Sequence, residues 1–143
     1  MNNRLVLRGD WRLAKQTVFA VALVATLIGQ AAAGQAASTG QPDPQRLIGR
    51  WIRPDGGYVL QITEAGVAGT LKAAYFNPRP INVAKAEWRV KGDALTVFIE
   101  LRDVNYPGST YTLTYDAGSD RLSGNYYQAV EKQTFAIEFM RKP

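Results

Sequence analysis

Cysteine and histidine are both absent from this 143-residue sequence. Without cysteine the chain has no disulfide bond, although small exported domains are often stabilised by disulfides. Its fold must therefore be held by burial of apolar side chains and by backbone hydrogen bonds, which about 100 residues achieve only marginally. The lack of histidine removes the commonest general base, the commonest zinc ligand and every Ser-His or Cys-His nucleophile.

Other signs of enzyme chemistry are also scarce. The sequence contains no metal-ligand spacing and no glycine-rich phosphate loop. Glu100 and Glu138 fall on outward positions of the strands expected below, where they are poor candidates for buried acids. Asp103 follows Arg102, and a surface ion pair explains that neighbourhood without catalysis. We therefore predict no catalytic residue, no metal and no cofactor, and keep an enzyme as a third alternative.

An excess of one charge is also missing once the N-terminus is set aside. Of the 17 Lys and Arg and the 12 Asp and Glu, four cations and one anion lie in the first fifteen residues, which leaves 13 cations and 11 anions. The remaining chain is thus only +2, and its acids and bases alternate along the expected strands. A nucleic-acid binder normally has a strongly basic face, so nucleic acid is not expected as a partner.

The first 33 residues have the three parts of a secretory signal. Cations come first, an uncharged apolar run from Thr17 to Ile28 follows, and the small residues Ala31-Ala32-Ala33 come next. We predict a cleaved Sec-type signal peptide over 1–33, with cleavage after Ala36 or Ala37 as alternatives. An uncleaved anchor is a further alternative, but the run is shorter than the about 20 residues that span a bilayer. The expected location is the bacterial periplasm or the medium, with no stable membrane insertion after cleavage.

The rest of the chain has the patterning of an all-β domain. A polar segment with two prolines, 38–45, predicts a disordered leader over 34–46, followed by a folded domain over 47–143. From residue 47 onward, apolar residues alternate with polar ones, and turn residues recur every 8–12 positions. This pattern predicts eight strands, over Gly49–Arg53, Tyr58–Thr63, Thr70–Phe76, Lys85–Lys91, Ala94–Asp103, Ser109–Asp116, Arg121–Gln128 and Thr134–Arg141.

Eight consecutive strands with short links predict an antiparallel up-and-down meander. An open sheet of this kind would leave two exposed edges, and closure into a barrel removes them. We therefore expect an eight-stranded β-barrel, whose interior is filled by side chains or holds one small ligand. A two-sheet sandwich is the alternative fold.

One short motif at the start of the domain resembles a known superfamily. Gly49-Arg50-Trp51 opens the first strand, and Arg141 lies near the end of the last one. A G-x-W of this kind resembles the calycin barrels, which include lipocalins, fatty-acid-binding proteins and avidins. The resemblance implies that Arg141 packs across Trp51 by a cation–π contact and closes one barrel end. For Trp51 we favour this structural role over contact with a ligand.

Within that superfamily the chain is most similar to avidin. Gly49-Arg50-Trp51 followed by Gly56-Gly57 resembles avidin's first strand and turn, and the strand that ends at Tyr75 resembles the one carrying its ligand-contacting tyrosine. Two ureido-binding positions differ, because Arg53 and Gly57 stand where avidins have Asn and Ser. Only Tyr75 carries over, so biotin binding is not predicted.

The unusual loops gather at one end of the predicted barrel. Loops at alternate connections share an end, so Asn77–Asn82, Arg102–Gly108 and the turn at Pro54 meet at one mouth, with Arg53 and Asp55. Arginine binds carboxylate or phosphate bidentately, which favours an anionic ligand. The alternative is that Asn77 and Asn82 satisfy their own loop backbone. The predicted ligand-binding residues are Tyr75, Asn77, Arg79, Asn82, Arg102, Asp103, Asn105, Tyr106 and Tyr126.

The sequence therefore predicts a small-molecule-binding barrel, with an amphipathic or anionic ligand at the loop-rich mouth. Inward tyrosines support either a polar cavity or a solid core whose hydroxyls reach water, and both readings stay open. The alternative function is a non-enzymatic protein-interaction module, envelope-associated or inhibitor-like, with a solid barrel. Outward Phe98 and Tyr127 indicate an interaction patch or the face of a homodimer.

Overall fold

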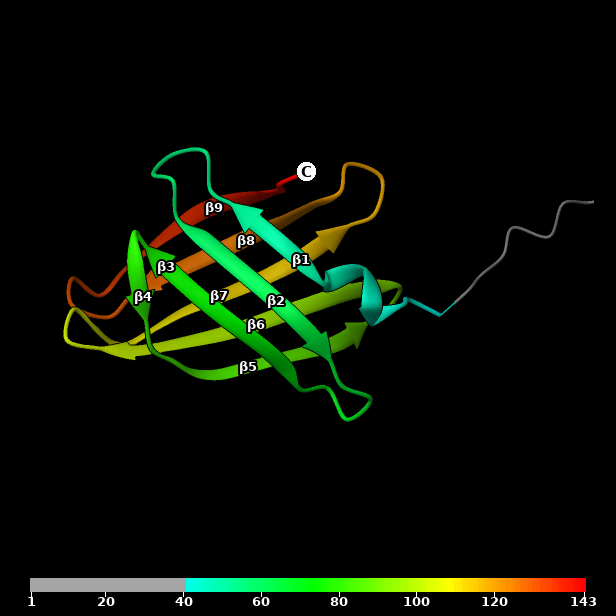
Figure 1. Ribbon diagram of the computed structural model, residues 1–143, viewed down its shortest axis with the longest axis horizontal. Coiled ribbons are helices and arrows are strands. Elements are labelled where there is room, and N and C mark those ends of the chain that lie inside the picture. Colours follow the sequence, from blue (N-terminus) through cyan, green and yellow to red (C-terminus); the bar gives the residue numbers. More distant parts are fainter. Residues whose placement is uncertain (1–40) are drawn as a thin grey trace, which may run out of the picture. The chain divides into compact units, whose positions relative to one another are not determined.

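The computed structural model describes residues 41–143 (Figure 1). The predicted signal peptide and the first part of the predicted leader lie outside these residues. The described chain begins with a 3₁₀ helix, η1, and continues as nine strands. Their bounds are η1 Pro44–Leu47, β1 Gly49–Ile52, β2 Val59–Ala65, β3 Leu71–Asn77, β4 Arg79–Ile81, β5 Val83–Lys91, β6 Ala94–Asp103, β7 Tyr106–Asp116, β8 Arg121–Gln128 and β9 Gln133–Arg141.

All nine strands belong to one antiparallel sheet in the order β4-β3-β2-β1-β9-β8-β7-β6-β5. The first strand, β1, pairs with the last strand, β9, and Trp51 lies opposite Arg141 in this pairing. The sheet curls until β3 and β5 approach, so that β1–β3 cross over the long strands β5–β9 in Figure 1. The predicted all-β antiparallel barrel is confirmed, and it is nearly closed.

A short seam joins the two edges of the sheet. Thr70, just before β3, forms an isolated bridge with Glu87 of β5. The Trp88 N–H donates to the Gly69 carbonyl at 2.8 Å, and the Trp88 indole N–H donates to the Gly66 carbonyl at 2.8 Å. These contacts satisfy backbone groups that an open edge would leave unpaired.

The prediction of eight strands was wrong by one. Arg79–Ile81, expected as a loop, forms β4 and pairs with the end of β3, with Phe76 opposite Pro80. Proline usually marks a break because it lacks an N–H, but it is tolerated on an edge strand, and β4 lies at the edge of the sheet. Likewise the loop expected over Asn105–Gly108 is shorter, because β7 starts at Tyr106 and leaves a two-residue turn.

The folded part also begins earlier than residue 47. Pro44–Leu47 forms η1, which Asp43 caps by accepting a hydrogen bond from the Gln45 N–H at 2.9 Å. The Gln45 side chain donates to the Ala65 carbonyl at 3.0 Å, and Leu47 is fully buried. The last residues of the predicted leader therefore belong to the barrel, because η1 packs Leu47 into the core at one end.

The barrel interior follows the alternation of the sequence. In β6, the buried residues Leu95, Val97, Ile99 and Leu101 alternate with partly exposed ones. Alternation along β5 and β9 predicts that Val90 and Phe135 also face inward, but they are 41% and 42% exposed. Val90 is the last residue but one of β5, and Phe135 is the third residue of β9 and lines the cavity described below.

Candidate functional site

A cavity of about 440 Å³ opens at one end of the barrel. It lies where the β1–β2, β3–β4, β6–β7 and β8–β9 connections meet, at the end where Figure 1 shows β4. Its lining consists of one charged pair, three amide side chains, a group of aromatic rings and two aliphatic residues. The amides are Asn77, Asn105 and Gln128, the rings are Tyr58, Tyr75, Tyr106, Tyr111, Tyr126 and Phe135, the aliphatic residues are Ala136 and Ile137, and the charged pair is Arg53 with Asp55.

Arg53 is the buried charge of this cavity, with 7% of its surface exposed. It follows β1 two positions after the buried Trp51, so strand alternation turns it inward. Its Nε and Nη2 donate to the two carboxylate oxygens of Asp55, at 3.0 and 2.5 Å. Its Nη1 donates to the Tyr111 hydroxyl at 3.1 Å. The guanidinium also lies 4.5 Å from the centre of the Tyr58 ring, a cation–π distance.

The Arg53–Asp55 pair stays ionised in this setting. Burial by itself lowers the pKa of Arg53, but the hydrogen bonds to Asp55 and Tyr111 outweigh burial and raise that pKa above its usual value. The hydrogen bond from Arg53 lowers the pKa of the Asp55 carboxyl. A bidentate pair of opposite charges therefore contributes no net charge to the cavity.

Two buried tyrosine hydroxyls form the cavity floor beside Arg53. The oxygens of Tyr75 and Tyr111 are 2.7 Å apart, and both residues are at most 1% exposed. Burial raises the pKa of Tyr75, and burial raises the pKa of Tyr111 to about 12, partly offset by its hydrogen bonds with Tyr75 and Arg53. Both hydroxyls therefore remain protonated at neutral pH.

Aromatic rings and amides form the walls. The Tyr111 and Tyr126 rings are stacked with centres 4.6 Å apart, and they face each other because the two residues pair in register across β7 and β8. The Tyr106 ring lies edge-on to Tyr75 at 6.4 Å. The Asn77 amide nitrogen donates to the Tyr106 hydroxyl at 2.6 Å. This combination suits a ligand with a flat or apolar body and a few polar atoms.

The structure brings together five of the nine predicted ligand-binding residues. Tyr75, Asn77, Asn105, Tyr106 and Tyr126 line the cavity. Arg79, Asn82, Arg102 and Asp103 do not line it.

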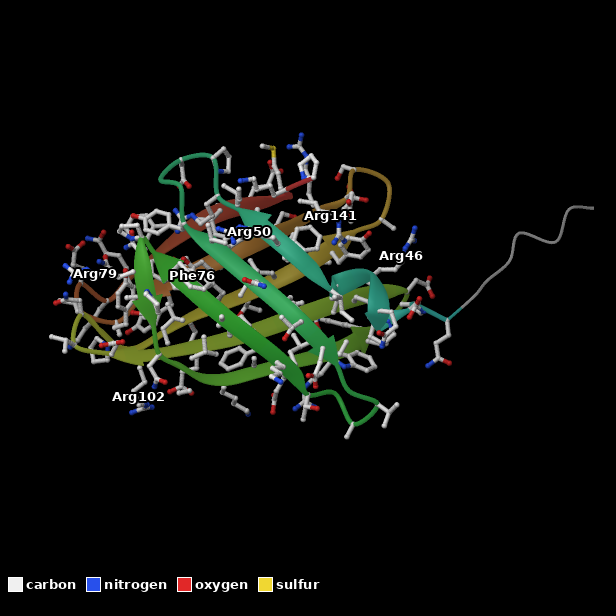
Figure 2. The ribbon with its side chains drawn as sticks, in the orientation of Figure 1. Arg46, Arg50, Phe76, Arg79, Arg102 and Arg141 are labelled. Carbon is white, nitrogen blue, oxygen red and sulfur yellow. The ribbon has the colours of Figure 1, made fainter. Side chains whose placement is uncertain are left out.

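Three of these four residues hold the start of β5 against the end of β6. The Asn82 N–H donates to Asp103 Oδ2 at 3.0 Å, and the Asn82 side-chain amide donates to the Arg102 carbonyl at 3.0 Å. The Arg102 side chain pairs with Glu100 and points away from the barrel in Figure 2. Arg79 lies on the exposed edge strand β4. The Asn82 side chain thus bonds backbone, as the alternative expected, but at the end of β6 and not in its own loop, whereas the Asn77 side chain bonds the Tyr106 hydroxyl.

Arg53 and Tyr111 are the functional candidates that the predicted site omitted. From the sequence, Arg53 is expected at the mouth but is not among the predicted ligand-binding residues. The signal that could have found it is the alternation of β1, continued one step past Trp51. Tyr111 was expected to face inward, and its register partner Tyr126 was already in the predicted site.

Away from the cavity, Arg141, labelled in Figure 2, packs on Trp51. The Arg141 guanidinium lies 4.1 Å from the centre of the Trp51 ring. Its Nη1 donates to the Ile48 carbonyl at 2.7 Å, and its Nε donates to Asp120 Oδ2 at 2.6 Å. The Trp51 indole N–H donates to the Leu47 carbonyl at 3.0 Å, which ties η1 to β1.

Comparisons with known proteins give no further assignment. No family model, no curated protein and no solved structure matches the chain. Within residues 41–143 there is no helix long and apolar enough to cross a membrane. The same residues contain no group of three or more acidic side chains that could hold a metal ion.

Proposed function

We propose that this chain is an exported, non-enzymatic barrel protein that binds a small molecule in the mouth cavity. The observation that carries the proposal is the cavity of about 440 Å³ with the buried Arg53 and two tyrosine hydroxyls at its floor. A space of about 300 Å³ or more, walled by aromatic rings and containing a few convergent polar groups, is the usual composition of a ligand site. A solid core would have filled this space with side chains.

The proposal includes a calycin-like architecture, which the closed end supports. A Cβ added at Gly49 would lie 2.2 Å from Arg141 Nη1, so a larger residue there would displace the guanidinium from the Ile48 carbonyl. The glycine of the G-x-W motif therefore leaves room for the Arg141 guanidinium. The same guanidinium packs on the tryptophan of the motif, Trp51.

A protein partner at the same end is the second candidate function. Val104 is 91% exposed, Val130 is 60% exposed and Phe135 is 42% exposed, and all three lie in or beside the loops around the mouth. Exposed apolar residues near one another are typical of interaction surfaces. They also suit an amphipathic ligand whose apolar end projects from the cavity.

Native mass spectrometry of the protein recovered after export by a bacterial host tests the proposal. We expect a non-covalent adduct of small-molecule mass on the wild type. Gln128→Trp should abolish the adduct, because Gln128 lines the cavity and the larger indole would fill that space from the wall. Thr134→Trp is the matched control, since it adds the same ring at an exposed position that does not line the cavity.

The outcomes separate the two candidate functions. An adduct that survives in Gln128→Trp would place the bound molecule elsewhere and contradict the proposal. A wild-type protein that carries no adduct and has the mass of a dimer would favour the protein-interaction candidate.

A further inference from the structure

The floor of the cavity has more hydrogen-bond donors than acceptors. Three hydrogens meet there, one from Arg53 Nη1 and one from each hydroxyl of Tyr75 and Tyr111. Two contacts join these groups, and each uses one hydrogen. One hydroxyl hydrogen is therefore left without an acceptor, although both tyrosines are at least 99% buried.

The direction of the chain of hydrogen bonds identifies which hydrogen is left. A hydroxyl whose oxygen accepts from a charged donor becomes a stronger donor itself. The 2.7 Å contact between Tyr75 and Tyr111 allows either hydroxyl to donate, and acceptance from Arg53 favours Tyr111 as the donor, which leaves the Tyr75 O–H for the cavity. Both residues line the cavity, so an acceptor in that space can reach the floor.

Other donors face the same space. The Tyr106 oxygen accepts from Asn77, so the Tyr106 O–H is also available to donate. Arginine has five N–H hydrogens, and the bonds to Asp55 and Tyr111 use three of them. A ligand that places an acceptor oxygen at the floor would satisfy these groups.

The charge of the lining decides between a charged and an uncharged acceptor. Arg53 and Asp55 are the charged lining residues, and they neutralise each other. Asp55 already occupies the Nε/Nη2 face of the guanidinium and neutralises it, so a ligand carboxylate would find no unpaired cation among the described lining residues. A ligand anion or cation would thus bring an unpaired charge into a partly buried space, which is costly.

We propose that the mouth cavity binds molecules with an uncharged carbonyl head, such as an amide or ester, whose oxygen accepts from the Tyr75 hydroxyl at the floor. The apolar or aromatic body of the ligand then lies against Tyr126 and Phe135, which are register partners on the cavity wall, toward the apolar rim. This inference rests on the proposed function, and it narrows the amphipathic-or-anionic class to uncharged carbonyl compounds.

A matched series of small probes tests the head group. Phenylacetamide, phenylacetate and 2-phenylethylamine share a benzyl body and differ in carrying a neutral carbonyl, a carboxylate and an ammonium. Each is titrated at pH 7 into the ¹⁵N-labelled wild-type protein, and binding is read from shifts of the Asn77, Asn105 and Gln128 side-chain amides. We expect phenylacetamide to bind about tenfold more tightly than either charged probe.

Two tyrosine variants test the position of the head. Tyr75→Phe keeps the ring and removes the hydroxyl. It should lower the affinity for phenylacetamide by about five- to tenfold. Tyr115→Phe is the control, because its hydroxyl bonds Asp120 near the closed end and does not line the cavity. It should leave the affinity unchanged. The ranking of the three probes on the wild type decides the head group even where Tyr75→Phe fails to fold.

Each outcome has one meaning. Tightest binding of phenylacetate or of 2-phenylethylamine overturns the inference and leaves the proposed function standing. Equal affinity of phenylacetamide for wild type and Tyr75→Phe also overturns it, because the head is then not at the floor. Absence of shifts with all three probes overturns both the inference and the proposed function.

Discussion

Arg53 and Arg141 lie near opposite ends of the barrel, and each guanidinium is satisfied in a different way. Arg141 is held by two backbone carbonyls, by Asp120 and by the face of Trp51, so its position is fixed by groups that cannot move independently. Arg53 is held by one carboxylate in a turn, by one hydroxyl and by the face of Tyr58, and within residues 41–143 none of its side-chain hydrogen bonds goes to a backbone carbonyl. The closed end is therefore built for rigidity, whereas the open end keeps donors that a ligand can use.

Replacement of Arg141 tests the contribution of the closed end. Arg141→Met keeps the apolar stem against Trp51 but loses the charge and its hydrogen bonds, so we expect the free energy of unfolding to fall by about 2–4 kcal/mol. Urea denaturation followed by tryptophan fluorescence measures this loss. Arg121→Met is the control, because Arg121 and Glu138 form a half-exposed ion pair whose loss should cost less than about 1 kcal/mol. Equal losses in the two variants would show that Arg141 is an ordinary surface cation.

At the scale of elements, the barrel depends on the seam between β3 and β5. The seam is short, and one of its residues has a backbone that only glycine adopts easily. Gly69 has φ +84°, and its carbonyl accepts from the Trp88 N–H at 2.8 Å. A Cβ at this position would lie 2.9 Å from the Trp88 carbonyl oxygen. The closure therefore requires both the left-handed conformation and the missing side chain.

Gly69→Ala should open the seam. The substitution adds the cost of a left-handed alanine and a clash with the β5 backbone, and we expect a loss of about 2–3 kcal/mol in the free energy of unfolding. Gly92→Ala is the control, since Gly92 has φ +62° with open space around its Cβ, and it should cost about 1 kcal/mol. Hydrogen exchange of the Trp88 amide should accelerate in Gly69→Ala. The acceleration should exceed what the loss in the free energy of global unfolding explains. Unchanged exchange would mean that the seam does not depend on Gly69.

The elements also show what could be predicted from the sequence. Alternation is a local property of each strand, so it was sufficient to predict the inward rows of β6 and β7, the antiparallel barrel and the end at which the loops gather. It could not predict β4, because Pro80 gives the same signal on an edge strand as in a loop. Alternation could not distinguish Asn77, which lines the cavity, from Asn82, whose backbone N–H donates to Asp103 at the end of β6. That difference depends on a tertiary contact.

For the whole molecule, the buried tyrosines link stability to pH. The described chain lacks disulfides, so stability depends on the core and on the hydrogen bonds that close the barrel. Tyr75 and Tyr111 belong to the core and to these hydrogen bonds, since both are buried, they hydrogen bond to each other, and Tyr111 also accepts from Arg53. A tyrosinate at either position would put a negative charge into a space where burial disfavours it.

We expect the protein to lose stability on the alkaline side, between about pH 10 and pH 12. The pKa of Tyr111 is raised from 10.0 to about 12 in the folded state, mainly by burial. Below pH 10 the hydroxyl is protonated in both states and its contribution is full. Between the two values only the unfolded chain ionises, so about 2–3 kcal/mol is lost as pH rises. Urea midpoints at pH 9 and pH 11.5, with tyrosinate absorbance recorded on the folded protein, measure this effect. Tyr111→Phe should lose less stability over the same interval, whereas an equal loss in both proteins would assign the alkaline transition to other groups.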